Sequence, residues 1–202
     1  MNVIFDVGNV LIRWAPERAV AHVFPDPAEA MAYLHRVGFF DWNYQQDGGR
    51  SWEDGLATLE AAHPGQAVPL AAYRERFALT IDAPIDGSWA LAERLVEAGH
   101  RLFAITNFAA YLWPVAVDLH PRLASIFDDV VVSGEVKMLK PGPGIFDCLL
   151  RRNALNPAQC LFIDDSPANV EGARAVGMMA HHFTTPEGLA DALVSLGLLQ
   201  GD

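Results

Sequence analysis

The 202-residue sequence predicts an α/β fold, namely a Rossmann-like three-layer core with a parallel five-stranded sheet and an inserted helical cap. Five short, mostly apolar runs have the length and composition of strands buried on both faces. Helical patterns separate the later runs, and strand alternating with helix is typical of a parallel sheet with right-handed crossovers. Residues 14–84 break this rhythm, because they contain helix-like stretches and no convincing strand.

The core elements are expected in the following order. The strands are Asn2–Phe5, Arg101–Thr106, Asp129–Ser133, Cys160–Asp164 and Met178–Phe183. The helices are Trp89–Ala98, Gly144–Asn153 and Asn169–Val176, and glycines directly after the first and last of them are typical helix stops.

The inserted segment is expected to form helices over Pro16–Val23, Ala28–Val37, Trp52–Ala62 and Ala71–Leu79, with prolines and glycines between them. We therefore predict a core domain made of residues 1–13 and 85–202. Residues 14–84 would form a helical cap domain, and we call this segment the cap.

Composition limits the function classes. The chain is 51% hydrophobic and 19% charged, which is typical of a globular protein, and its net charge of −11 would repel the phosphate backbone of nucleic acids. No apolar run approaches the roughly 20 residues that span a bilayer. The apolar start is interrupted by Asp6 with no basic residue before it, unlike a signal peptide, and two cysteines cannot make a disulfide framework. We expect a cytoplasmic monomer or homodimer with no nucleic-acid or membrane partner.

Polar residues follow four of the expected strands, at the sheet edge where open parallel sheets bind ligands. Asp6 follows the first strand, and Thr106-Asn107 closes the second. Lys140 lies in the loop after the third, and Asp164-Asp165 closes the fourth. These residues are therefore expected to converge on one site.

Each of these residues also has a simpler interpretation. Asp6 could cap a strand end, Thr106 could be a β-branched strand residue, and Lys140 could be a solvated loop charge. Asp165 could be the N-cap of the next helix. Two adjacent carboxylates after a buried strand repel each other unless a cation is present, however, and all four sites fall at the same edge. The convergence favours a functional site.

Four motifs carry a resemblance that covers most of the chain. They are Phe5-Asp6-Val7-Gly8-Asn9-Val10, Phe103-Ala104-Ile105-Thr106-Asn107, Lys140-Pro141, and the run from Leu161 to Ala173 that contains Asp164-Asp165. With these motifs the chain resembles the haloacid dehalogenase superfamily, whose members are mostly phosphatases. The Asp-Xaa-Gly-Asn-Val form and the helical cap are similar to the subgroup that includes sugar-1-phosphate phosphatases.

The resemblance implies a nucleophile and a metal site. Asp6 would attack phosphorus and form an aspartyl phosphate, which splits one difficult step into two. Mg²⁺ would lie between Asp6, the backbone carbonyl of Gly8 and Asp165, with Asp164 assisting through water. Mg²⁺ prefers oxygen ligands and retains waters, so few carboxylates suffice.

The resemblance also implies a phosphoryl site. The Thr106 hydroxyl and the Asn107 backbone would hold phosphoryl oxygens, and Lys140 would neutralise their charge. Lys140 fits the motif better than Lys137, which we expect to be a surface charge. The implied function is a Mg²⁺-dependent phosphatase acting on a small phosphorylated metabolite, such as a sugar phosphate or more narrowly a sugar 1-phosphate.

One position departs from the family pattern. Most phosphatases of this superfamily carry a second aspartate two residues after the nucleophile as general acid and base, and this chain has Gly8 there. Either the leaving group needs little protonation, as with an anomeric phosphate, or a cap residue supplies the proton. Asp47, in Gln46-Asp47-Gly48, is the candidate, although it could simply form an Asp-Gly turn.

Several other residues leave alternatives open. Trp42, Trp52 and Tyr44 could line the substrate pocket or pack the cap helices. Asn169 could orient the metal cluster or only start the next helix. His181 and His182 lie in a strand and point to opposite faces, so a structural role is expected.

Rival functions use the same residues. A 2-haloacid dehalogenase would use Asp6 without a metal, although the Asp164-Asp165 pair would repel an anionic substrate. Gly8 also leaves open a catalytically weak pseudoenzyme that binds a phosphorylated metabolite. A phosphomutase would normally need the aspartate that is missing at position 8.

Overall fold

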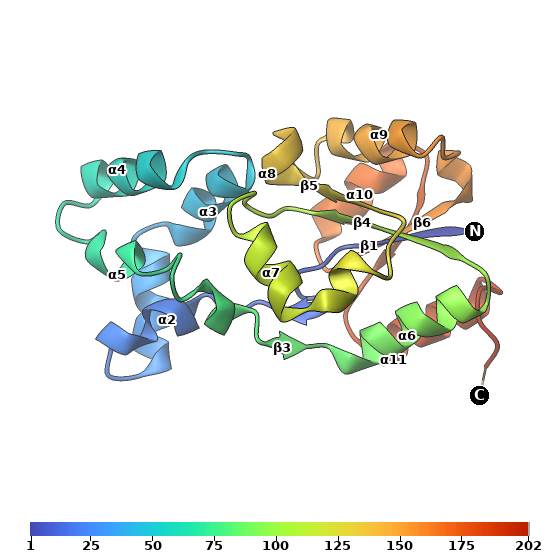
Figure 1. Cartoon of the computed structure of the whole chain (residues 1–202), viewed down its shortest axis with the longest axis horizontal. Coiled ribbons are helices and arrows are strands. Elements are labelled where there is room, and N and C mark those ends of the chain that lie inside the picture. Colours follow the sequence, from blue (N-terminus) through green and yellow to red (C-terminus); the bar gives the residue numbers. More distant parts are fainter. Residues whose placement is uncertain (202) are drawn as a thin grey trace.

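The structure, a computed structural model, describes residues 1–201, and its core is one parallel five-stranded sheet (Figure 1). The strand order is β5-β4-β1-β6-β7. The strands are β1 (Asn2–Phe5), β4 (Arg101–Thr106), β5 (Asp129–Val132), β6 (Cys160–Asp164) and β7 (Met179–His182). All five expected strands are confirmed, except that β5 ends before Ser133 and β7 is one residue shorter at each end.

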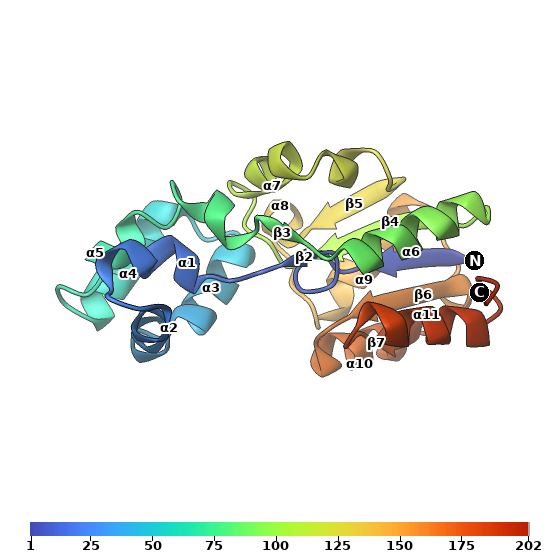
Figure 2. The ribbon, with the colours of Figure 1, turned by 90° about the horizontal axis from the view of Figure 1, so that it is seen from below.

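Helices cover both faces of this sheet. On one face lie α6 (Asp86–Glu97) and α11 (Pro186–Ser195), and on the other α9 (Pro143–Arg152) and α10 (Pro167–Ala175) (Figures 1 and 2). Side chains alternate along a strand. Val3 and Phe5 of β1 accordingly join the apolar cluster that contains α6 and α11, whereas Ile4 joins the cluster under α9 and α10. The expected three-layer α/β core is confirmed.

The cap segment lies beyond the carboxyl ends of the strands (Figures 1 and 2). Its elements are α1 (Glu17–Val20), the 3₁₀ helix η1 (Ala21–Val23), α2 (Pro27–Arg36), α3 (Phe39–Asp47), α4 (Trp52–Ala62), α5 (Val68–Ala71) and the 3₁₀ helix η2 (Phe77–Thr80). The helix α3 was not expected, because its aromatic residues have modest helix propensity. The cap therefore extends over the strand ends where the polar residues converge.

The expected helix over Ala71–Leu79 is wrong. After α5 the chain makes turns and then enters η2, where the Leu79 amide donates to the Arg76 carbonyl at 3.0 Å. Bonds of this i→i+3 type give the tighter 3₁₀ geometry. They leave the Thr80 carbonyl beside the Ala15 amide, which donates to it at 2.8 Å, so the two ends of the cap meet.

A short ribbon also joins these two ends. The strands β2 (Ile12–Arg13) and β3 (Ala83–Pro84) pair antiparallel where the chain leaves the core and returns to it. Two residues are too few to give a strand pattern, so the sequence did not indicate them. The division into residues 1–13 with 85–202 and residues 14–84 stays a prediction.

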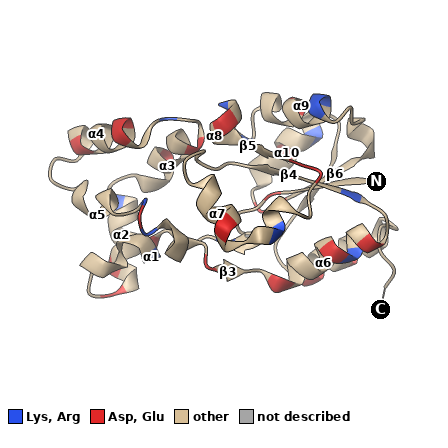
Figure 3. Cartoon of the chain, viewed as in Figure 1, with Lys and Arg blue, Asp and Glu red and all other residues tan. Residues whose placement is uncertain are grey.

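The remaining elements are short: α7 (Trp113–Leu119), η3 (Pro121–Ala124), α8 (Ser133–Val136) and η4 (Pro157–Gln159). Both signs of charge are interspersed on the outer helices, for example along α6 and α9 (Figure 3). Among residues 1–201, no helix combines the length and apolar character needed to cross a bilayer.

Candidate active site

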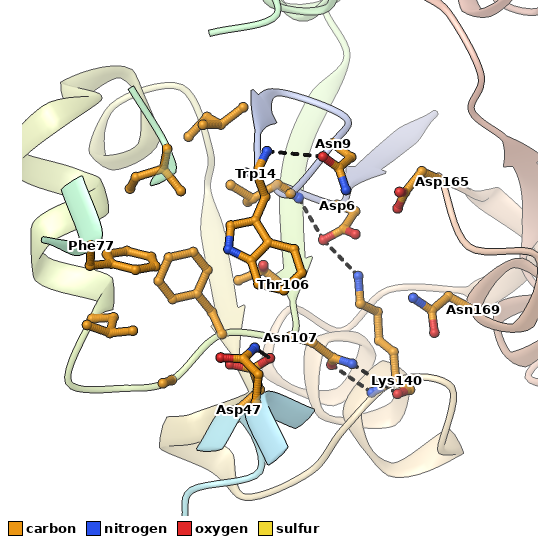
Figure 4. Close-up of a pocket in the computed structure, with 18 of the residues that line it drawn as sticks. Asp6, Asn9, Trp14, Asp47, Phe77, Thr106, Asn107, Lys140, Asp165 and Asn169 are labelled. Carbon is orange, nitrogen blue, oxygen red and sulfur yellow. Dashed lines mark hydrogen bonds and ion pairs between the residues drawn. The ribbon is translucent and has the colours of Figure 1, made fainter. Parts of the chain in front are cut away.

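A cavity of about 210 Å³ lies between the carboxyl ends of the strands and the cap (Figure 4). Its lining comes from β1 and the following loop, from the cap, from the loop after β4, and from the loops after β5 and β6. The lining residues are Asp6, Val7, Gly8, Asn9, Ile12, Trp14, Asn43, Asp47, Tyr73, Phe77, Ile81, Thr106, Asn107, Phe108, Ala109, Leu112, Lys140, Asp165 and Asn169.

Asp6 lies directly after the central strand of the sheet. Its amide donates to the Ile163 carbonyl of β6 at 2.8 Å, and its Oδ1 accepts from the Val7 amide at 2.7 Å. Only 11% of the Asp6 side chain is exposed, and that part opens into the cavity. The carboxylate is therefore fixed by the sheet and faces the cavity.

Lys140 connects two of the acidic residues. Its Nζ lies 2.8 Å from Asp6 Oδ1 and 2.7 Å from Asp164 Oδ2, and the side chain is fully buried. Burial raises the pKa of Asp6, Lys140 opposes this rise, and Asp164 adds to it. Burial alone would lower the pKa of Lys140, but its two carboxylate partners outweigh burial and raise it. The ammonium therefore stays charged beside the nucleophile candidate.

The Asn107 side chain holds the backbone of Lys140. Its Nδ2 donates to the Lys140 carbonyl at 3.0 Å, and its Oδ1 accepts from the Lys140 amide at 2.9 Å. Tyr44 of the cap donates its hydroxyl to the same carbonyl at 3.1 Å. Asn107 thus positions the lysine. Binding of phosphoryl oxygens by the Asn107 backbone and by Thr106, which is buried at the end of β4, stays a prediction.

Asp164 is the most enclosed carboxylate of the site. It is fully buried, and its Oδ1 accepts from the Ser166 amide at 2.8 Å. Asn169 Nδ2 lies 3.0 and 3.2 Å from the two oxygens of Asp164. The helix α10 begins at Pro167, so Asn169 is not its first residue. Through Asp164, the Asn169 amide orients the group of Asp6, Asp164 and Asp165, which we call the acidic cluster.

The acidic cluster fits a divalent cation. Carboxylate oxygens of Asp6, Asp164 and Asp165 lie within 4.8 Å of one another, with the Lys140 ammonium as their buried counter-charge. Burial and the neighbouring Asp164 raise the pKa of Asp165, which is the sign of an uncompensated negative charge. Hard oxygen ligands of this kind suit Mg²⁺, and Gly8 lines the same cavity.

Asn9 is a site residue whose role the sequence did not reveal. Its φ of 55° lies in the left-handed region, which Asn tolerates better than most residues. There its Oδ1 accepts from the Trp14 amide at 3.1 Å, and its side chain hydrogen-bonds Asp165, which lowers the pKa of that carboxyl. Figure 4 shows the hydrogen bond between Asn9 and Trp14, with Asp165 near the Asn9 side chain, so Asn9 lies between the acidic cluster and the start of the cap. The sequence signal that could have indicated this role is an asparagine, which tolerates positive φ, directly after Gly8.

Asp47 lines the cavity from the cap side, opposite Asp6 (Figure 4). It is the last residue of α3 rather than part of a free turn. Its Oδ2 accepts from Asn43 Nδ2 at 2.9 Å, and its backbone carbonyl accepts from the Ser133 hydroxyl at 2.6 Å. Burial raises the pKa of Asp47 to about 7, although the Ala109 amide and Lys140 lower it. A carboxyl that exchanges a proton near neutral pH therefore shares the cavity with Asp6.

Gly8 has space around it. A Cβ added at this position would meet no atom within 4 Å, and the residue has no positive φ. The glycine is therefore not required by packing or by backbone conformation. The missing second aspartate is a chemical difference that the fold does not impose.

Other expected residues lie away from the cavity. Trp42 and Trp52 are buried in the cap with their rings 5.7 Å apart, so the packing interpretation holds for them. Lys137 is exposed, as expected. His182 points toward the Asp165 carbonyl at 3.0 Å, a contact that supports the expected structural role.

Comparisons with known proteins agree with this geometry. A model of the haloacid dehalogenase-like hydrolase family matches residues 1–177. Fructose-1-phosphate phosphatase YqaB of Escherichia coli is 33% identical over 82 residues, which are 41% of this chain and 44% of that protein. Sesquiterpene phosphatase astK of Aspergillus oryzae is 25% identical over 184 residues, which are 90% of this chain and 88% of that protein. The chain spans less than half the length of two of the curated relatives that it matches.

Solved structures share the fold. A HAD family enzyme from Bacteroides thetaiotaomicron, crystallised as a magnesium complex, superposes with a TM-score of 0.69 at 19% identity. The alignment covers 95% of this chain and 97% of that one. At this identity the likeness concerns the fold alone.

Proposed function

Because the chain belongs to the haloacid dehalogenase-like hydrolase family, we propose that it is a Mg²⁺-dependent phosphatase that hydrolyses a small phosphorylated metabolite through an aspartyl phosphate on Asp6. The observation that carries the proposal is the chain of contacts from Asp6 through the buried Lys140 to Asp164, next to Asp165. It combines a fixed nucleophile, a permanent positive charge and a cation site in one cavity.

The first step is the attack of an Asp6 oxygen on phosphorus, with cleavage of the bond between phosphorus and the alcohol oxygen. Lys140 holds Asp6 in position through their 2.8 Å ion pair and offsets the charge of the phosphoryl oxygens. Thr106 and the Asn107 backbone would bind two of these oxygens. In the second step water attacks the aspartyl phosphate and releases inorganic phosphate, which regenerates Asp6.

Asp6, Asp165 and the Gly8 carbonyl would hold Mg²⁺, with Asp164 in support. When bound, the ion would offset the charge of the carboxylates and of the phosphoryl group. Asn169 and Asn9 keep Asp164 and Asp165 in place for this purpose.

Asp47 is the residue that we propose as general acid and base in place of the aspartate missing at position 8. In its protonated form it would give a proton to the leaving alcohol oxygen. In its ionised form it would accept a proton from the water that attacks the intermediate. Its position in the cavity and its pKa of about 7 support this double role, because both forms are then present at neutral pH.

The rival functions have less support. A 2-haloacid would bring its own carboxylate next to Asp164 and Asp165, and this repulsion argues against a dehalogenase. The intact Asp6 and Lys140 argue against a protein that only binds a metabolite. The expectation of a sugar phosphate stays a prediction. The name of the E. coli relative supports it, whereas the name of the A. oryzae relative indicates an apolar substrate.

The test is phosphate release from sugar, nucleoside, alkyl and aryl monophosphates, with Mg²⁺ and with a chelator, for wild type and Asp6→Asn. We expect release that requires Mg²⁺ and falls by at least about 10³-fold in Asp6→Asn. Thermal melting of the variant would check that it folds. Release that persists in Asp6→Asn or in chelator, or release from no compound, would refute the proposal.

A further inference from the structure

The cavity has two halves of different chemistry. One half, which we call the phosphoryl half, is lined by Asp6, Asp165, Lys140 and Thr106, with Asp164 buried behind them. The other half lies under the cap and presents mainly hydrocarbon surface, from Ile12, Trp14, Tyr73, Phe77, Ile81, Phe108, Ala109 and Leu112. Most of these side chains are at most 4% exposed, and Trp14 and Phe108 are partly buried. We call this second half the apolar half.

The apolar half is preformed by contacts among its own rings. Phe77 lies between Tyr73 and Phe108, with ring centroids 6.0 and 5.5 Å away. Tyr73 also packs against Phe39 of α3 at 5.2 Å. Such ring pairs stabilise a fixed arrangement beyond the area that they bury. The apolar half can therefore bind a group of matching shape without a rearrangement of its side chains.

The polar groups of this half already have partners. Trp14 Nε1 donates to the Tyr73 hydroxyl at 3.3 Å, and Asn43 donates to Asp47 at 2.9 Å. The only other lining groups with polar side chains are Asn9, Asn107, Asn169 and the residues of the phosphoryl half. Apart from the remaining capacity of Tyr73, Asn43 and Asp47, this half offers no side-chain hydrogen-bond partner to the hydroxyls of a hydroxyl-rich leaving group.

From this lining we propose that the substrate is the phosphate monoester of a small apolar alcohol, with a short aliphatic chain or a single aromatic ring in the apolar half. This inference rests on the proposed phosphatase function and adds the substrate class. The alcohol would leave with its oxygen toward the Asp47–Asn43 pair and its hydrocarbon part against Phe77 and Ile81. The phosphoryl group would face Asp6 and Lys140.

The size of the cavity limits the alcohol. Pockets for drug-sized ligands commonly measure about 300–1,000 Å³, and this cavity measures about 210 Å³. The phosphoryl group takes part of that volume. A short chain or one ring fits this description, and a long chain would have to extend past the cap.

The reaction balances without a further reactant. Asp6 forms a bond to phosphorus, the bond between phosphorus and the alcohol oxygen breaks, and that oxygen takes a proton from Asp47. Water then forms a bond to phosphorus and releases Asp6, and Asp47 regains its proton from that water. The sum is ester plus water giving alcohol plus inorganic phosphate.

The experiment compares kcat/KM for unbranched alkyl phosphates of increasing length, benzyl phosphate, glucose 6-phosphate and fructose 1-phosphate. We expect kcat/KM to rise about fourfold per added methylene until the cavity is filled. We also expect benzyl phosphate to exceed both sugar phosphates by at least about tenfold, because each buried hydroxyl without a partner weakens binding. Sugar phosphates that equal or exceed the apolar esters would overturn the inference and leave the phosphatase proposal intact. Release from no ester would instead remove the phosphatase proposal on which the inference rests.

Two variants of Ile81, which lines the apolar half, test whether the alcohol part of the substrate binds in this half. Ile81→Thr shortens the side chain and introduces a hydroxyl into the apolar half, and Ile81→Val, whose side chain has nearly the same shape as threonine, shortens it without adding polarity. We expect Ile81→Thr to lower the ratio of kcat/KM between benzyl phosphate and fructose 1-phosphate by at least about fivefold, and Ile81→Val to change it by less than about twofold. Leu112→Gln with Leu112→Met repeats the comparison in case Ile81→Thr does not fold. Equal ratios in the polar and apolar variants would overturn the assignment of this half as the alcohol site.

Discussion

The two halves of the cavity are built in different ways. In the phosphoryl half, Asp6, Thr106 and Asp164 lie at or directly after strand ends, and hydrogen bonds fix their neighbours. In the apolar half, the wall comes from the short strand β2, from turns and a 3₁₀ helix of the cap, and from the loop after β4. Under the proposals made above, the phosphoryl half would carry out the reaction, and the apolar half would select the alcohol. The following predictions test this division of roles.

The largest effect is expected for Lys140→Met. Removing the ammonium leaves Asp6 and Asp164 buried without their shared partner, which lowers the free energy of unfolding by about 3–5 kcal/mol. Phosphate release should fall with it. Lys137→Met is the matched control on the same loop, where the exposed side chain should contribute less than about 0.5 kcal/mol. Chemical denaturation measures both, and equal losses would mean that the phosphoryl half does not depend on this ion pair.

Asp47→Asn should affect substrates according to their leaving group. With alkyl phosphates, whose alcohols need a proton, kcat/KM, which reports the formation of the aspartyl phosphate and not its hydrolysis, should fall by about 10²–10⁴, because general acid catalysis is lost. With 4-nitrophenyl phosphate, whose leaving group needs little protonation, the loss should stay below about tenfold. Asp41→Asn, an exposed change on the same helix, is the control. Uniform losses across the two substrates would assign Asp47 to binding or positioning instead of proton transfer.

Gly8→Asp should partly replace Asp47. The position has room for a side chain, so an added carboxyl can serve as a second proton donor. In the Asp47→Asn background we expect Gly8→Asp to recover kcat/KM for alkyl phosphates by at least about tenfold. Gly8→Ala supplies a Cβ without a carboxyl and should recover nothing. Recovery by both variants, or by neither, would contradict the prediction that a carboxyl at position 8 can replace Asp47 as the proton donor.

The last prediction concerns how the stability of the protein depends on pH. The pKa of Asp47 is about 7 in the folded protein because burial raises it, so between about pH 4 and 7 the folded state holds a proton that the unfolded chain releases. The free energy of unfolding therefore falls as pH rises through this range. Asp47→Asn cannot lose that proton, and a difference of about three pKa units between the folded and unfolded states should make its stability relative to wild type about 4 kcal/mol higher at pH 8 than at pH 4. Melting curves at the two pH values measure this, and a gain of the same size at both would exclude titration as the cause.

The phosphoryl half could be read from sequence because strand ends are fixed by apolar runs. Asp6, Thr106 and Asp164 lie where such runs end, and the parallel topology brings them together without any knowledge of loops. Asp47 was identified as a candidate only because the aspartate expected at position 8 was missing. Asn9 was not assigned a role, because its contact with Asp165 depends on a single left-handed residue.

The apolar half could not be read in the same way. Tyr73 and Phe77 fall in the segment that was expected to be one helix and is a set of turns and a 3₁₀ helix. For Trp42, Trp52 and Tyr44 the sequence left open whether they line the pocket or pack the cap helices, and it did not single out Trp14 or Tyr73. Which aromatic residues face the cavity depends on how helices pack against each other, and packing is not encoded in local periodicity.

The position of β1 at the centre of the sheet has a consequence for how the protein is made. Asn2 pairs with Arg101 on one side and with Cys160 on the other. A ribosome therefore produces β1 and Asp6 first and their neighbours in the sheet much later, and the apolar strand stays unpaired while about half of the chain is synthesised. Closing such long loops is slow and exposes the strand to wrong partners. Any chain terminated before β6 lacks both Asp165 and one neighbour of β1, so we expect a prematurely ended product to be a client for chaperones and proteases.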